Sequence, residues 1–372
     1  MSGEDKSLAE RIEFPTIPED ARSKISHVQE ELERAELEQL RKSVPLFAPI
    51  FKKREEIISL PSVKPDFWSR VFSAAPSEIE EYILEADAEI LSESLRNVLV
   101  ERFEVDAEGN GEPRSLRFTF EFDPENNEYF DNAKLVKEFY WRKQVQKTAK
   151  GKRRAWEGLV SDPVRINWKS PEFDPTHGLL DAACDLFEAE KKGGKRSDLP
   201  EYEALVKKLE VAEAEAMKGA DEMEDEEFEM PEGDDESPAG ASFFSFFAYR
   251  GRDVSAEQNE QAVKEDEERW AKIAKGEEVP EDDDEDEDDD EEDFDLVDDL
   301  EEAEVFPGGE DLAIAIAEDL WTNALKYYAE SFQPSFDFDD DDFEDLEGMD
   351  EDEDEDEADE GEDQPPAKKA RN

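Results

Sequence analysis

The sequence has few of the residues on which most active sites depend. In 372 residues there is one cysteine, Cys184, and there are two histidines, His27 and His177. A single cysteine excludes an intramolecular disulfide and leaves a thiolate zinc site short of ligands. With two imidazoles, nucleophilic triads and multi-histidine metal sites are poor candidates. We therefore expect a protein of a reducing compartment that is not an enzyme and needs no cofactor.

Long apolar runs and positive charge are also scarce. No stretch approaches the roughly 18 apolar residues of a membrane span, and the first ten residues lack the apolar region of a signal peptide. Lys and Arg number 44 against 110 Asp and Glu, which gives a formal net charge of -66. Such a chain is repelled by DNA, RNA and anionic lipid, so neither direct DNA binding nor membrane binding is expected. The expected partners are basic proteins or multivalent cations.

The negative charge is concentrated in two runs. Residues 281–293 are thirteen consecutive carboxylates, and residues 337–363 are almost as dense. Burying unpaired carboxylates is very unfavourable, so such runs stay hydrated outside a packed core. We expect a disordered N-terminus (1–20), a long helix (21–60), one folded domain (61–332) with flexible acidic insertions at about 219–240 and 276–304, and a disordered acidic tail (333–372).

Apolar residues spaced by three or four predict the long helix over 21–60. At about 1.5 Å per residue it approaches 60 Å and cannot bury its own apolar stripe. The stripe either lies on its own domain or pairs with a second copy, in a parallel or antiparallel arrangement. Pro45 and Pro49 predict a kink or a break. The predicted dimerisation residues are Ile25, Val28, Leu32, Leu37, Leu40, Val44, Phe47, Phe51 and Ile58.

The apolar period changes to two in the middle of the chain. In residues 116–122 large apolar side chains alternate with Arg117, Thr119 and Glu121, as in a half-buried strand. Turn-forming residues separate this strand from others expected at 98–105, 135–141 and 164–169. Further helices are expected at 77–95, 179–190, 200–218 and 310–330. The fold class is therefore α+β, with a four-stranded antiparallel sheet flanked by helices.

An abrupt apolar segment, SFFSFFAYR at 242–250, has to pack on something. It belongs to a set of six short motifs that occur in a fixed order. They are APIFKKREEI (48–57), DFWSRVF (66–72), NEYFDNAKLVKEFYW (127–141), INWKS (166–170), SFFSFF (242–247) and DLWTNALKYY (319–328). This order resembles the nucleosome assembly protein family, and within it the SET (template-activating factor) branch. The acidic insertion at 219–236 and the segment 251–309 lie outside the resemblance.

The resemblance implies a histone chaperone that forms a homodimer through the long helix and carries an earmuff domain on each side. It would bind core histones through an acidic folded surface and acidic tails, shield them, and promote nucleosome assembly and disassembly. Its location would be the nucleus, with or without shuttling to the cytoplasm, and the basic end of the chain, Lys368, Lys369 and Arg371, is a predicted nuclear localisation signal. The histone-binding candidates are Asp123, Glu125, Glu128, Glu318, Asp319, Asp337, Asp339 and Asp340.

Other functions stay open at this point. The resemblance also allows a regulatory scaffold, as the partner of a histone acetyltransferase or as a phosphatase inhibitor. Dense carboxylates could make a low-affinity calcium buffer, although the acidic runs contain no D-x-D-x-D-G-x5-E loop. The basic patch at 147–154 is either a nucleic-acid or nuclear-import contact or a plain hairpin loop.

Overall fold

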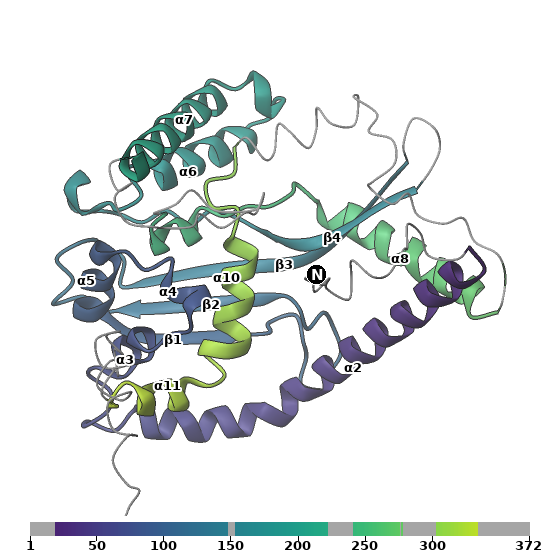
Figure 1. The fold of residues 1–372 in the computed structure, drawn as a ribbon, viewed down its shortest axis with the longest axis horizontal. Helices are drawn as coiled ribbons and strands as arrows, with labels where there is room; N and C mark the ends of the chain where they lie inside the picture. The colour runs from purple at the N-terminus through teal and green to yellow at the C-terminus, as the bar shows by residue number, and fades with distance from the viewer. Residues whose placement is uncertain (1–18, 148–152, 222–240, 276, 278–302, 334–372) are drawn as a thin grey trace, which may run out of the picture. The chain divides into compact units, whose positions relative to one another are not determined.

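The computed structural model describes residues 19–147, 153–221, 241–275, 277 and 303–333. The chain divides into two units, 1–331 and 332–372, and the first unit contains the helices and the sheet. Its helices are α2 (Glu19–Ile58), α3 (Phe67–Ser73), α4 (Ser77–Glu80), α5 (Glu85–Ser94), α6 (Leu179–Glu190), α7 (Pro200–Asp221), α8 (Ala256–Ile273), α10 (Gly309–Ala315) and α11 (Ala324–Glu330). Figure 1 shows α10 crossing one face of a sheet, α6 and α7 toward one edge, and α2 along the other.

The sheet is an antiparallel meander in the order β1-β2-β3-β4, as the sequence predicts. Its strands are β1 (Leu95–Glu101), β2 (Leu116–Phe122), β3 (Lys134–Lys147) and β4 (Arg153–Ser161). The prediction of the fourth strand at 164–169 is wrong. That segment is irregular, and the Val164 amide donates to the Phe247 carbonyl over 2.8 Å. The true β4 is an edge strand in which exposed, half-buried and buried side chains do not alternate regularly, so its apolar period is weak.

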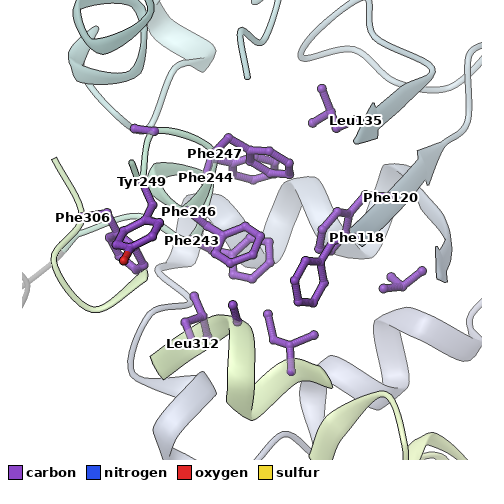
Figure 2. Close-up of a cluster of buried hydrophobic side chains, with 14 of the residues drawn as sticks. Phe118, Phe120, Leu135, Phe243, Phe244, Phe246, Phe247, Tyr249, Phe306 and Leu312 are labelled. Carbon is purple, nitrogen blue, oxygen red and sulfur yellow. The ribbon is translucent and has the colours of Figure 1, made fainter. Parts of the chain in front are cut away.

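The core centres on the apolar segment, which forms a 3-10 helix, η3 (Phe243–Phe247). All four of its phenylalanines are fully buried, which confirms that the segment packs inside the domain. Figure 2 shows Phe243 and Phe246 between the β2 rings and Leu312 of α10. The ring centroids of Phe118 and Phe246 lie 5.4 Å apart in an edge-to-face arrangement, which favours aromatic contact beyond simple burial.

The last helical region is broken rather than continuous. Between α10 and α11 the chain forms a π-helix, η4 (Ile316–Leu320). Leu312, Ile316 and Leu320 are buried, whereas Leu325, further along the predicted helix, is 39% exposed. A π-turn holds more residues than an α-turn, so it rotates the side chains of the next helix about the helix axis. Ala324 and Tyr327 take the inward face instead.

Two other helical predictions need correction. The helix expected at 77–95 is two helices, α4 and α5, separated by a turn. The segment 251–309, left without predicted structure, contains the 18-residue helix α8. By contrast α6 has the predicted bounds, α7 extends slightly beyond them, and α2 runs unbroken through Pro45 and Pro49 with a bend along its length (Figure 1).

Candidate functional site

One face of α2 carries apolar side chains that are largely exposed. They are between 41% and 68% exposed, and they are Ile25, Val28, Leu32, Leu46, Phe47, Ile50 and Ile57. At about 100° per residue all of these except Phe47 fall within about 60° of the helix circumference. We call this set the outer stripe. A continuous apolar surface of this kind is typical of a protein interface.

The outer stripe contains only some of the predicted dimerisation residues. Ile25, Val28, Leu32 and Phe47 belong to it, whereas Leu37, Leu40, Val44 and Phe51 are half-buried on other sides of the helix and Ile58 is 4% exposed. Ile58 is therefore part of this chain's own core. The residues that continue the outer stripe are Leu46, Ile50 and Ile57, which the prediction from sequence missed. Their positions keep the helical phase of Leu32, and that phase was the available signal.

Arg54 anchors the C-terminal half of α2 to the domain. Its guanidinium lies 4.0 Å from the Trp321 ring centroid and 4.7 Å from that of Phe51, and it donates to the Trp321 carbonyl. Burial lowers the pKa of Arg54 to about 10, so the side chain is still charged at neutral pH. Burial also raises the pKa of the adjacent Glu55, whose carboxylate is 3.7 Å from Arg54. The inner face of α2 is thus fixed by a buried cation between aromatic rings.

A second anchor lies nearer the middle of α2. The Arg41 Nε donates to the Gly111 carbonyl over 2.7 Å, in the loop between β1 and β2. Gly111 has a φ of +114°, and a Cβ there would lie 1.8 Å from the Glu104 carbonyl oxygen. Only glycine fits this turn without strain. The turn therefore positions the backbone acceptor that Arg41 binds.

Two of the acidic candidates lie on the π-helix η4. Glu318 is 54% exposed and pairs with Arg102 over 3.0 Å. Asp319 instead accepts from the Asn323 amide and from the Tyr327 hydroxyl, each over 2.8 Å. Burial, with Asp319 as the next contributor, raises the pKa of Tyr327 to about 12. Glu318 is therefore available to a partner, whereas Asp319 holds its own helix together.

Three other candidates lie in the turn between β2 and β3. Asp123 accepts from the Asn126 amide over 2.8 Å and from the Glu125 backbone over 2.9 Å, and it pairs with Arg96. These contacts, the Asn126 side chain first, hold the pKa of Asp123 below its usual range. Glu125 and Glu128 are exposed. Asp123 is thus a turn residue, and the two glutamates are the free carboxylates of this group.

The structure does not bring the two acidic groups together. The register pairs Leu95 with Phe122 at one end of β1 and Glu101 with Arg117 at the other. Arg102 and its partner Glu318 lie beyond the second end, so the groups are separated by about 20 Å of strand. The remaining candidates, Asp337, Asp339, Asp340, Lys368, Lys369 and Arg371, lie outside the described residues, as does the run 281–293.

The sheet face turned away from η3 carries paired charges. Arg117 is 2.7 Å from Glu138 and 3.8 Å from Glu101, and Lys134 is 3.5 Å from Glu121. Cross-strand pairs of opposite charge stabilise a sheet locally. Because its carboxylates are neutralised in place, this face is less suited to a basic partner than the exposed turn that carries Glu125 and Glu128.

The described part of the chain offers no obvious chemistry for catalysis. It contains no group of three or more His, Cys, Asp or Glu residues placed to hold a metal ion. Burial raises the pKa of the Cys184 thiol to about 11, which disfavours the thiolate. His177 lies in a turn with a φ of 52°, just before the helix α6 that carries Cys184. No helix among the described residues is long and apolar enough to cross a membrane.

Comparisons with known proteins give the proteins to which this chain is similar. A curated Schizosaccharomyces pombe protein, whose name describes it as a nucleosome assembly protein, is 36% identical over 147 residues. The match covers 39% of this chain and 56% of the relative, so it spans little more than half the relative's length.

Solved structures similar to this chain include that of Ccp1, with a TM-score of 0.45 and 24% identity over 86% of this chain and 98% of the other. Another is nucleosome assembly protein S from Plasmodium falciparum, with a TM-score of 0.26 and 24% identity over 41% of this chain and 72% of the other. The sequence model of the nucleosome assembly protein family matches residues 61–331, which include the whole sheet, η3 and the last helices. The chain belongs to the nucleosome assembly protein family.

Proposed function

We propose that this protein is a histone chaperone that binds core histones through exposed carboxylates and promotes nucleosome assembly and disassembly. The observation that carries the proposal is a family match over 61–331 on a chain whose net charge is -66. Histones present dense Lys and Arg side chains. Carboxylates compete for them by the same counterion release that favours DNA binding.

The proposed binding has two parts. The acidic runs at 281–293 and 337–363 supply capacity and fast, salt-sensitive association. The exposed carboxylates Glu125, Glu128 and Glu318 lie on a rigid domain, and they supply contacts that depend on the shape of the partner. A weak polyanion and a shaped surface together allow a histone to be held and then released to DNA.

We also propose that two copies pair through the outer stripe in an antiparallel arrangement. Two residue pairs of the stripe are symmetric about Arg41, so that Ile25 would meet Ile57 and Leu32 would meet Ile50 of a second copy. The core of each domain packs on the C-terminal half of its own helix, at Arg54 and Ile58, so antiparallel pairing places the two cores at opposite ends. A parallel pair would force them side by side.

The experiment that tests histone binding compares the full chain with a variant in which the carboxylates of 281–293 and 337–363 are replaced by Gln and Asn. The dissociation constant for each histone pair is measured by fluorescence titration at two salt concentrations. We expect the variant to bind more weakly and with a smaller salt slope, because fewer counterions are released. The matched control is E125Q/E128Q/E318Q, which should lower affinity with little change in slope. An unchanged slope in the first variant contradicts the two-part binding, and a wild-type chain that ignores histones contradicts the function.

Nuclear localisation follows from the same proposal and is tested separately. Substituting Lys368, Lys369 and Arg371 with Ala should move a fluorescent fusion toward the cytoplasm. An acetyltransferase partner stays a prediction from the sequence.

A further inference from the structure

The helix α8 joins α2 to the far end of the sheet. In Figure 1 it lies between the N-terminal half of α2 and the hairpin of β3 and β4. On the α2 side, the Trp270 ring stacks on His27 with centroids 5.2 Å apart, and the Arg34 guanidinium lies 4.7 Å from the Trp270 centroid. On the sheet side, the Lys143 backbone donates to the Asn259 side chain over 2.8 Å. One helix thus holds two elements that are distant in sequence.

The attachment of α8 is mainly polar. Ala262 is its one buried residue, and a polar cavity of about 100 Å³ remains between α8 and β3, lined by side chains that include Gln144, Gln146, Gln258 and Gln261. The contact lacks the apolar packing that normally fixes a helix on a domain. Ionic contacts therefore decide whether α8 stays in place.

Asp266 is the centre of these ionic contacts. Its carboxylate lies 3.0 Å from Arg34 on α2, 3.3 Å from Lys143 on β3 and 3.9 Å from Arg153 on β4. The side chain is 20% exposed. Arg34 also pairs with Glu30 of its own helix over 3.0 Å, and Lys143 pairs with Glu157 of the neighbouring strand over 2.9 Å. Asp266 is the carboxylate of α8 that joins cations from α2, β3 and β4, so its removal breaks the ion pairs between these elements. A neighbouring pair, Arg269 and Glu30 at 3.7 Å, ties the same two helices.

The N-terminal half of α2 needs such a support. The ion pairs and ring contacts that join residues 24–40 to other described elements run to α8. Pro45 and Pro49 lack an amide hydrogen, so two helical hydrogen bonds are missing between this half and the anchored half. A hinge of about 10° at Pro45 would move Ile25, about 30 Å away, by about 5 Å. Apolar side chains are in contact when their heavy atoms lie within about 4.5 Å, so a shift of this size would break the contacts of Ile25 with a second copy.

We propose that α8 is an ionic strut, with Asp266 as its key residue, that fixes the angle of the N-terminal half of α2 and so prepares the outer stripe for pairing with a second copy of this chain. The inference rests on the dimer of the proposed function and adds the element that controls it. Fixing the helix beforehand lowers the ordering cost of association. Because the charges are partly exposed, salt weakens the strut.

The first test measures dimer dissociation of the full chain by analytical ultracentrifugation. The variant D266K reverses the key charge, and E260K makes the same change on the exposed side of α8. We expect D266K to raise the dissociation constant roughly tenfold at low salt relative to E260K. The difference should shrink as salt is raised, because the wild-type strut is screened. Equal dissociation constants for the two variants would overturn the proposal.

The second test does not depend on the dimer. Hydrogen exchange of the amides of residues 24–34 is compared between wild type, D266K and E260K, with the β2 amides reporting that the domain is folded. We expect faster exchange at 24–34 in D266K alone. A wild type that stays monomeric contradicts the dimer, yet the exchange result still decides the strut. Equal exchange at 24–34 in the three proteins refutes it.

Discussion

Lys137 on β3 should make the stability of the fold depend on pH in a way that a surface lysine does not. It is fully buried, and its amine donates to the carbonyls of Asp162, Phe247 and Tyr249 over 2.9, 3.2 and 2.6 Å. Burial lowers the pKa of Lys137 to about 7, although Glu304 partly opposes the change. The side chain thus ties η3 and the segment after β4 to the centre of the sheet.

The magnitude follows from the two protonation states. In the unfolded chain Lys137 keeps its ordinary pKa of about 10.4. Between about pH 7 and pH 10 the unfolded state therefore binds more protons than the native state. Stability therefore rises with pH in this window. From pH 7 to pH 9 the gain from this one group is about 2 kcal/mol.

The substitution Lys137→Met removes both the amine and its hydrogen bonds. Each carbonyl left unpaired costs about 1–3 kcal/mol, while removing the buried amine at pH 7 relieves a penalty of about 5 kcal/mol. The two effects are of similar size at pH 7, so wild type and variant should have similar stabilities there. Between pH 7 and pH 9 the wild type gains about 2 kcal/mol and the variant does not, so at pH 9 the variant should be the less stable protein.

The assay is urea unfolding followed by tryptophan fluorescence at pH 7, 8 and 9, at one protein concentration. The matched control is Lys134→Met, which changes a half-exposed lysine on the same strand. The free energy difference between wild type and Lys137→Met should grow with pH, and that for Lys134→Met should stay flat. A difference for Lys137→Met that is independent of pH would refute the reasoning, because it would mean that burial does not displace the titration of this amine.

Two further predictions concern the interface and the core. The double substitution Leu32→Ala/Ile50→Ala should raise the dimer dissociation constant about 1000-fold in sedimentation equilibrium. The two side chains are 58% and 56% exposed in the single chain, and burying each in the interface contributes about 1 kcal/mol. A two-fold dimer loses four such side chains, which gives the predicted change. Val211→Ala, on an exposed position of α7, is the control, and an equal effect there would contradict the outer stripe as the interface. Gly309→Ala should destabilise the domain by about 1–3 kcal/mol in thermal unfolding, because its Cβ would lie 2.4 Å from Cδ2 of the buried Tyr249 ring, and a wild-type melting temperature would contradict that packing.

Elements with a strong apolar period were predictable from the sequence. The bounds of α6 follow from an amphipathic run between Gly178 and the Lys/Gly segment that begins at Lys191. The strand β2 follows from its strict alternation of apolar and polar residues. The burial of η3 follows from its four phenylalanines, whose exposure to water would be unfavourable. In each case local chemistry and tertiary packing favour the same structure.

The parts that were missed depend on contacts that the sequence does not display. Helix α8 is held by ion pairs and is on average far more polar than α6, so it offers few of the large apolar residues from which helices were predicted. On α2, apolar residues occupy two faces, and spacing alone does not say which face meets the domain. The acidic candidates were chosen by charge, whereas their separation is set by the register of β1 on β2. The strand β4 was missed because an edge strand is only half covered.

The helix α2 belongs to the core of its own domain and also carries the outer stripe. Ile58 and Arg54 fix its inner side, while Leu32 and Ile50 face outward on the same rigid element. Folding and pairing are then linked equilibria, because a partner that binds only the folded helix stabilises the folded domain by mass action. The melting temperature of this protein should rise with its own concentration. Dilution should lower the stability of the domain by separating the two copies, without any change in the packing of its core.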